Sequence, residues 1–259
     1  MSDSDKLNDI KITSTLYGLE DKFDFLFKLH INKKFPKVLM LSGKKGVGKL
    51  TLVSHFLNSI FDKKNYNLKK KTILLNSPFN KQFFSNSFSN IIYLNGSNFK
   101  NIKIDDIRAL KSLISKSTLL DKERFIILDD IELFNNNSLN ALLKIIEEPS
   151  GYNYFIMINN KSKDLLKTIL SRCIELKVLL TNQQRISIIS SLITHHNIEE
   201  VIDFKTSEIS PGQFFLLNNL CQQSQINLNE NLVKNIENLL NFYKKSKNYQ
   251  FINLILFIT

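Results

Sequence analysis

The sequence predicts an α/β protein with a parallel sheet covered by helices on both faces, followed by a helical C-terminal region. Three observations support this prediction. The expected strands are continuous apolar runs, as strands buried on both faces are. Helical patterns separate most of these runs, which is typical of a parallel sheet. From about Thr181 onward only helical patterns remain.

The first two expected strands are the runs "KVLMLS" at residues 37–42 and "IIYLN" at residues 91–95. The first run leads directly into a glycine-rich segment, and Leu52, Phe56 and Ile60 follow that segment at helical spacing. A strand, a glycine loop and a helix in this order are the context that a phosphate-binding loop requires. Residues 62–90 are mostly polar and predict a long surface excursion.

Three more apolar runs are expected to form strands, at residues 124–130, 154–160 and 174–178. The helices between them are expected around residues 105–117, 137–148 and 164–170. Carboxylates at Asp105 and Asp106 suit the positive N-terminal end of the first helix, and Pro149 stops the second. Two further helices are expected beyond about residue 226.

The composition is that of a soluble globular protein, with 43% hydrophobic residues over 259 positions. No apolar run approaches the roughly 20 residues that span a bilayer, and the polar N-terminal segment is no secretory signal. We therefore expect a cytoplasmic protein with no membrane partner. Cys173 and Cys221 lie far apart without histidines at metal-ligand spacing, so neither a disulfide framework nor a zinc site is expected.

The formal net charge of +11 is compatible with a nucleic-acid partner. It is equally compatible with compositional drift, because the chain is rich in Lys, Asn, Ile and Phe, residues that AT-rich codons favour. No compact basic motif interleaved with aromatic residues distinguishes the two interpretations. Charge alone therefore leaves both of them open.

The segment "GKKGVGKLT" departs from the phosphate-loop pattern at one position. The glycines and the lysine that suit such a loop are Gly43, Gly46, Gly48 and Lys49. Leu50, however, replaces the Ser or Thr whose hydroxyl binds magnesium. Thr51 is a poor substitute, because one residue along a helix turns a side chain by about 100°. The segment therefore predicts a degenerate phosphate loop.

Four stretches carry a more specific pattern: "GKKGVGK", "IKIDDIRALKSLI", "FIILDDIELFNNNSLNALLKIIEEPS" and "FIMINNKSKDLLKTILSRCIELKV". Together they resemble the clamp-loader branch of the AAA+ ATPases, and within it the delta-prime subunit family of bacterial DNA polymerase III. The succession of "NALLK", "EEP" and "SRC" is far more specific than the glycine loop alone.

The resemblance implies three domains: a RecA-like AAA+ nucleotide-binding-type domain over residues 1–178, a helical lid over 179–225, and the start of a helical collar over 226–259. The collar is shorter than in the family, so it is either reduced or truncated. Implied partners are clamp-loader ATPase subunits, a delta subunit and, through the complex, the sliding clamp and primer-template DNA. The family's four-cysteine zinc module is not carried over, because no cysteine lies between the glycine loop and the carboxylate strand.

The resemblance also implies a metal-holding aspartate, a water-activating carboxylate and a water-orienting polar residue. These positions are held by Asp129, by Asp130, and by Asn159 or Asn160. Asp130 is shorter than the glutamate of the family, and Gln213 in "SPGQ" stands where related ATPases have an arginine. With Leu50, these departures predict loss of hydrolysis, so no cofactor is expected, although binding of ATP or ADP without turnover stays open.

Arg172 lies in the motif "SRC", whose arginine in the family reaches into a neighbouring subunit's ATP site. The resemblance therefore implies that Arg172 acts in trans, where a guanidinium offsets charge on the transferring phosphoryl group. The alternative is an arginine that caps its helix or pairs with a carboxylate.

Two other pairs of charged residues carry weaker signals. Arg108 and Lys111 share one helix face, where they either contact duplex phosphates or face solvent. Glu147 and Glu148 are adjacent helix residues that point about 100° apart, so they predict a helix end rather than paired catalytic acids.

These features predict a non-catalytic clamp-loader subunit of the DNA polymerase III holoenzyme. It would complete a neighbour's active site and help load the sliding clamp on primed DNA during replication. Two alternatives stay open: a DNA-dependent clamp-loader ATPase whose site tolerates Leu50, and an AAA+-like DNA-binding protein outside the clamp loader.

Overall fold

The computed structural model describes residues 12–97, 102–115, 123–149, 151–226 and 232–259. Its contacts divide the chain into two units, with the boundary after Leu179. The first is an α/β unit. The second is a helical unit of Leu180–Thr259, with which Lys45–Val47 of the glycine loop also group. The end of the helix expected at residues 105–117 lies outside the described residues.

The α/β unit is built on one parallel sheet of five strands in the order β2-β3-β4-β1-β5. The strands are β1 (Val38–Ser42), β2 (Ile91–Asn95), β3 (Arg124–Asp129), β4 (Asn153–Asn159) and β5 (Ile174–Lys177). In the sheet register, Ser42 at the end of β1 lies opposite Asn159 of β4 and Lys177 of β5. The predicted parallel sheet and the strands expected from the apolar runs are confirmed.

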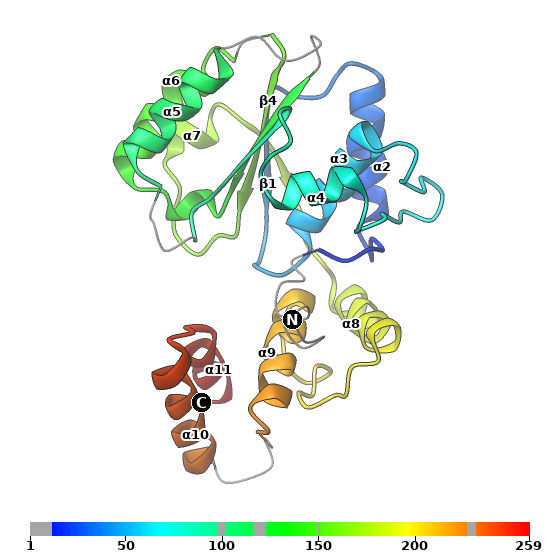
Figure 1. The fold of residues 1–259 in the computed structure, drawn as a ribbon, viewed down its shortest axis with the longest axis vertical. Helices are drawn as coiled ribbons and strands as arrows, with labels where there is room; N and C mark the ends of the chain where they lie inside the picture. The colour runs from blue at the N-terminus through cyan, green and yellow to red at the C-terminus, as the bar shows by residue number, and fades with distance from the viewer. Residues whose placement is uncertain (1–11, 98–101, 116–122, 150, 227–231) are drawn as a thin grey trace. The chain divides into compact units, whose positions relative to one another are not determined.

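Helices cover both faces of the sheet (Figure 1). One face carries α2 (Glu20–Ile31), α3 (Lys49–Phe61) and α4 (Pro78–Phe84), and the other carries α5 (Ile104–Ile114), α6 (Asn136–Ile146) and α7 (Lys167–Leu170). The expected helices after the glycine loop, after Lys103 and before Pro149 are confirmed. A short 3-10 helix, η2 (Ile131–Leu133), follows β3.

Two helices of the α/β unit were not predicted, α2 and α4. The surface excursion expected over residues 62–90 is therefore only partly right, since α4 buries Phe79 and Phe83. Ser77 caps α4 by accepting a hydrogen bond from the Asn80 backbone N–H at 3.2 Å, and proline follows at the first helical position. These are ordinary helix-start signals, and they outweigh the polar composition of the segment.

A reciprocal amide pair fastens α4 to α3. Asn58 and Asn80 are 1% and 0% exposed, and each donates its side-chain N–H to the other's side-chain oxygen at 3.0 Å. Because buried amides are costly without partners, this pairing satisfies two polar side chains at once and fixes the register of the two helices.

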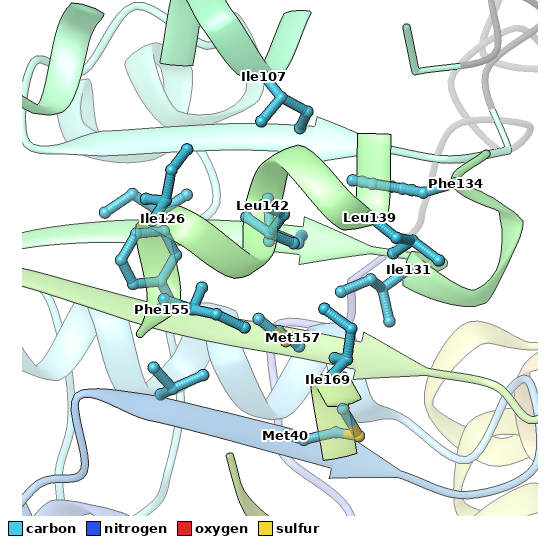
Figure 2. Close-up of a cluster of buried hydrophobic side chains, with 14 of the residues drawn as sticks. Met40, Ile107, Ile126, Ile131, Phe134, Leu139, Leu142, Phe155, Met157 and Ile169 are labelled. Carbon is cyan, nitrogen blue, oxygen red and sulfur yellow. The ribbon is translucent and has the colours of Figure 1, made fainter. Parts of the chain in front are cut away.

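The central strands β1, β3 and β4 are buried on both faces, which explains their continuous apolar pattern. Figure 2 shows the cluster on the face of α5, α6 and α7, in which strand residues Met40, Ile126, Phe155 and Met157 meet Ile107, Leu139, Leu142 and Ile169 of the helices. Alternate strand residues point to the opposite face, where Phe125 packs edge-on against Phe56 of α3 at 5.8 Å. Each such buried side chain contributes about 1.5–3 kcal/mol.

The helical unit contains α8 (Asn182–His196), α9 (Pro211–Gln223), α10 (Leu232–Ser246) and α11 (Gln250–Ile258). One apolar cluster joins these helices through Ile189, Phe214, Leu239 and Leu254, among others. The helical region and the two helices expected beyond residue 226 are confirmed, while the division into a lid and a collar stays a prediction. None of the described helices is both long enough and apolar enough to cross a bilayer.

A buried arginine organises the loop between α8 and α9. Arg185 is 8% exposed, and its guanidinium donates to the backbone oxygens of Phe204 at 2.7 Å and Ile209 at 3.3 Å. It also donates to the Asn182 side chain at 2.7 Å. These carbonyls would otherwise lie buried without donors, so Arg185 supports the fold of the helical unit.

His55 of α3 is fully buried in the α/β unit and predicts a specific pH dependence of stability. Its Nε2 lies 3.1 Å from the Thr13 carbonyl oxygen, which can only accept, so Nε2 carries the proton. Burial lowers the pKa of His55 to about 4 from 6.5. The unfolded chain therefore binds more protons than the folded chain between these pH values, and stability falls as pH drops through this window.

We expect wild type to lose about 3 kcal/mol more stability than His55→Gln between pH 7 and pH 4, because each pKa unit is worth about 1.4 kcal/mol. Urea unfolding at several pH values measures the difference, in which the shared carboxylate titrations cancel. His195→Gln, at an exposed position of α8, is the matched control and should follow wild type. Parallel pH curves for wild type and His55→Gln would contradict the assignment.

Candidate functional site

The glycine loop joins β1 to α3 in the order that the sequence predicts. Residues 43–48 form the loop, and the helix begins at Lys49. Gly46 and Gly48 have φ angles of 84° and 95°, in the left-handed region that glycine adopts without strain. The loop is therefore built as a phosphate-binding loop is built, with a helix N-terminus behind it.

Lys49 is folded back on its own loop. Its ammonium group donates to the backbone oxygens of Gly43 and Lys44, both at 2.7 Å, and the residue is only 3% exposed. Leu50 follows in the first turn of α3 and offers no oxygen, and Thr51 is the next residue along the helix. The loop thus has the expected lysine but lacks the expected hydroxyl.

Within the helical unit, the tip of the glycine loop meets the N-terminus of α9. The Gly212 N–H donates to the Gly46 oxygen at 2.8 Å, and the Ser210 hydroxyl donates to the Lys45 oxygen at 2.6 Å. A Cβ on Gly46 would lie 2.3 Å from Ser210 Oγ and 2.9 Å from the Gln213 nitrogen. Two glycines, Gly46 and Gly212, therefore permit backbone to approach backbone at this contact.

The carboxylate of Asp129, at the end of β3, already accepts two hydrogen bonds. Asp129 ends β3, is 8% exposed, and accepts a hydrogen bond on Oδ2 from the Tyr93 hydroxyl at 2.7 Å. Its Oδ1 accepts the Asp130 backbone N–H at 3.0 Å. Burial, together with the Asp129 charge, raises the pKa of Tyr93, which keeps the phenol protonated as a donor.

The second carboxylate belongs to a separate network with the end of β4. Asp130 has a left-handed backbone with φ of 50°, and its Oδ1 accepts the side-chain N–H of Asn160. The Asn160 backbone N–H donates to Glu132 Oε1 at 3.0 Å, and the Ser162 hydroxyl donates to the same oxygen at 2.9 Å. Asn160 is thus hydrogen-bonded to both Asp130 and Glu132.

Parallel pairing brings most of the predicted nucleotide-site residues to one edge of the sheet. Strands β3, β4 and β1 are consecutive neighbours, so their carboxyl ends carry Asp129, Asn159 and the glycine loop side by side. The Gly43 N–H donates to the Asn159 backbone oxygen at 3.2 Å, and the Asn159 side chain accepts the Lys161 N–H at 2.8 Å.

Arg172 is not at that edge. It lies two residues before β5, whose first residue, Ile174, pairs with Leu39 near the start of β1. Its guanidinium donates to Glu147 Oε1 at 3.0 Å and to the Thr168 oxygen at 3.1 Å. Both parts of the alternative interpretation, helix capping and carboxylate pairing, are thus present in the isolated chain.

The weaker candidates lie on the surface of the α/β unit. Arg108 makes an exposed ion pair with Asp105 at 2.9 Å, and Lys111 is exposed on the same helix, α5. A DNA contact at these two residues stays a prediction. Glu147 and Glu148 follow the last turn of α6, as expected of a helix end.

The residues present do not fit a magnesium ion of the kind that the phosphate-loop pattern serves. Magnesium requires several oxygen ligands in near-octahedral geometry, whereas Leu50 supplies none at the position where the pattern places a hydroxyl. In the described part of the chain, no group of three or more His, Cys, Asp or Glu residues is arranged to hold a metal ion.

The sequence analysis missed Tyr93 and Glu132, although a signal for the tyrosine was present. In "IIYLN", Tyr93 and Asn95 alternate with Ile92 and Leu94, so the polar pair shares one face of β2 and the apolar pair joins the core on the other. Polar residues on the inner face of a covered strand indicate a hydrogen-bonding role. Glu132 lies in the short 3-10 helix after β3, and no comparable pattern in the sequence pointed to it.

The sheet order, the glycine loop after β1 and the carboxylates at the end of β3 define an α/β protein with a parallel sheet and a phosphate-loop-like turn. Residues 19–184, more than half of the chain, match the family model described as "DNA polymerase III, delta subunit". The chain belongs to this family, which confirms the clamp-loader resemblance of its motifs.

Individual relatives agree with this assignment over shorter stretches. The DNA polymerase III subunit delta' of Pseudomonas aeruginosa is 37% identical over 76 residues, 29% of this chain and 23% of the relative. The delta' subunit of Buchnera aphidicola (subsp. Baizongia pistaciae) is 28% identical over 155 residues, 58% of this chain and 45% of the relative. The matched stretches thus span less than half of each relative.

A solved structure is also similar. It is a DNA polymerase III gamma-subunit-related protein from Thermotoga maritima, 20% identical, with a TM-score of 0.47 over 92% of this chain and 78% of that chain.

The close approach of Gly46 to α9 predicts an effect of a single methyl group. Gly46→Ala places a Cβ against Ser210 Oγ at a left-handed φ angle, so we expect a loss of about 1–3 kcal/mol in unfolding free energy. Hydrogen exchange should accelerate at the amides of Gly212 and its neighbours. Gly151→Ala is the control, because no atom lies within 4 Å of its added Cβ, and it should stay within about 0.5 kcal/mol of wild type. Equal effects of the two variants would disprove the contact.

Proposed function

We propose that this chain is a non-catalytic, delta-prime-type subunit of a DNA polymerase III clamp loader. In this role it offers Arg172 to the nucleotide of a neighbouring ATPase subunit and helps place the sliding clamp on primed DNA. It hydrolyses no nucleotide in its own glycine loop. Its proposed partners are the clamp-loader ATPase subunits and a delta subunit, with clamp and DNA reached through the complex.

The position of Arg172 is the observation that supports this proposal most directly. It precedes β5 and so lies toward the amino edge of the parallel sheet, while the glycine loop follows the carboxyl end of neighbouring β1. Arg172 therefore lies too far from the glycine loop to contact a phosphate bound there, because β1 and β5 run in the same direction for four paired residues. Any phosphoryl group that Arg172 contacts therefore belongs to another chain.

The glycine loop and the residues around it support the proposal that this chain hydrolyses no nucleotide itself. Hydrolysis in a loop of this type needs a metal ligand next to the lysine and a base aimed at water. Leu50 supplies no ligand, and the shortened Asp130 accepts a hydrogen bond from Asn160. The neutral Gln213 accepts a hydrogen bond from Ser210 at 2.9 Å and adds no positive charge.

The deciding measurement is DNA- and clamp-stimulated ATP turnover of the reconstituted loader. We expect Arg172→Ala in this subunit to lower turnover at the neighbouring site by about 10³-fold, the lower end of the range for arginines acting in trans. Lys49→Ala should leave turnover unchanged, because no hydrolysis takes place in this subunit's loop. If Lys49→Ala is the damaging change instead, this subunit is an active ATPase.

Glu147→Gln is the matched control for Arg172. It removes the carboxylate that holds the guanidinium at 3.0 Å while leaving the arginine in place. A subunit that uses Arg172 in trans should keep or slightly raise its turnover in this variant. If Arg172 acts only through its pair with Glu147, Arg172→Ala and Glu147→Gln should change turnover equally.

A further inference from the structure

Four side chains, from β2, from the turn after it and from the end of β3, form one continuous hydrogen-bond chain. The Ser97 N–H and hydroxyl both donate to Asn95 Oδ1 at 2.7 Å, which orients the amide group. Asn95 then donates to the Tyr93 hydroxyl oxygen at 3.1 Å. The Tyr93 hydroxyl in turn donates to Asp129 Oδ2 at 2.7 Å, so every donor in the chain points toward that carboxylate.

The sheet register makes this arrangement specific. Asn95 lies opposite Asp129 in the β2–β3 pairing, and Tyr93 is two residues earlier on the same face of β2. That face is the one covered by α3, whose first residue is Lys49. The tyrosine hydroxyl therefore reaches Asp129 from the side of the sheet on which the glycine loop's helix lies.

We propose that Tyr93 holds Asp129 as a structural acceptor that fastens edge strand β2 to β3, and thereby competes with any metal ion for Asp129 Oδ2. The inference rests on the proposed function, in which this subunit makes no use of a metal–nucleotide complex. It adds a second, independent block to the one at Leu50. Restoring a hydroxyl at position 50 alone is then insufficient to restore a metal site.

The consequence is a two-step rescue measured by binding rather than turnover. Isothermal titration of ADP into the full chain, once with Mn²⁺ and once with EDTA, gives the factor by which the metal strengthens binding. We expect a factor of about 1 for wild type and below about 3 for Leu50→Thr. Leu50→Thr combined with Tyr93→Phe should reach about tenfold or more, since Asp129 Oδ2 then no longer accepts the tyrosine hydroxyl.

Two matched variants test whether the gain passes through Asp129. Tyr66→Phe removes another buried tyrosine hydroxyl, which faces His55 Nδ1 at 3.4 Å, and combined with Leu50→Thr it should match Leu50→Thr alone. Adding Asp129→Asn to Leu50→Thr and Tyr93→Phe should abolish the gain. In the otherwise wild-type chain, Tyr93→Phe should lower the melting temperature by about 2–4 °C.

Each outcome separates this inference from the proposed function. A full metal-dependent gain in Leu50→Thr alone overturns the role of Tyr93, as does a double variant that gains no more than Leu50→Thr or that binds no ADP. An unchanged melting temperature in Tyr93→Phe refutes the structural half. Strong metal-dependent binding by wild type would instead refute the proposed function itself.

Discussion

The structure of the candidate site depends on one constraint, the parallel direction of all five strands. Parallel pairing sends every carboxyl end to the same edge, and the order β3-β4-β1 makes the glycine loop, Asp129 and Asn159 neighbours without any further device. The same constraint separates Arg172 from them, because the residues before a strand lie at the other edge. The parallel direction of the strands therefore determines both which residues lie at the candidate site and why Arg172 lies away from it.

Burial then explains why the polar groups at this edge pair with one another. A buried carboxylate without donors is costly, and in a phosphate-binding site metal and nucleotide help to meet that need. Here Tyr93 and a backbone N–H serve Asp129, Asn160 serves Asp130, and Lys49 turns to the carbonyls of its own loop. The polar groups at this edge thus pair with donors of the chain itself.

The sequence predicted the parts of this molecule that depend on local pattern. Continuous apolar runs located the strands, and the order of strand, glycine loop and helix located the loop, because burial and backbone freedom act through adjacent residues. Pairings between distant residues were beyond such patterns: the contacts of Tyr93 with Asp129 and of Arg172 with Glu147 follow from sheet order and helix packing. The helix α4 was missed for another reason, since a Lys- and Asn-rich segment concealed an ordinary Ser-Pro helix start.

The ion pair of Arg172 with Glu147 is consistent with a role in trans because it is weak. The two side chains are 33% and 58% exposed, and exposed pairs contribute only about 0–1 kcal/mol after screening and loss of side-chain entropy. A phosphoryl group on a neighbouring chain offers a guanidinium charge-assisted, bidentate hydrogen bonds in a drier setting, which are stronger. Exchange of Glu147 for such a partner therefore costs little. The pair holds the guanidinium near the amino edge, and in the proposed role a neighbour's nucleotide would replace the carboxylate.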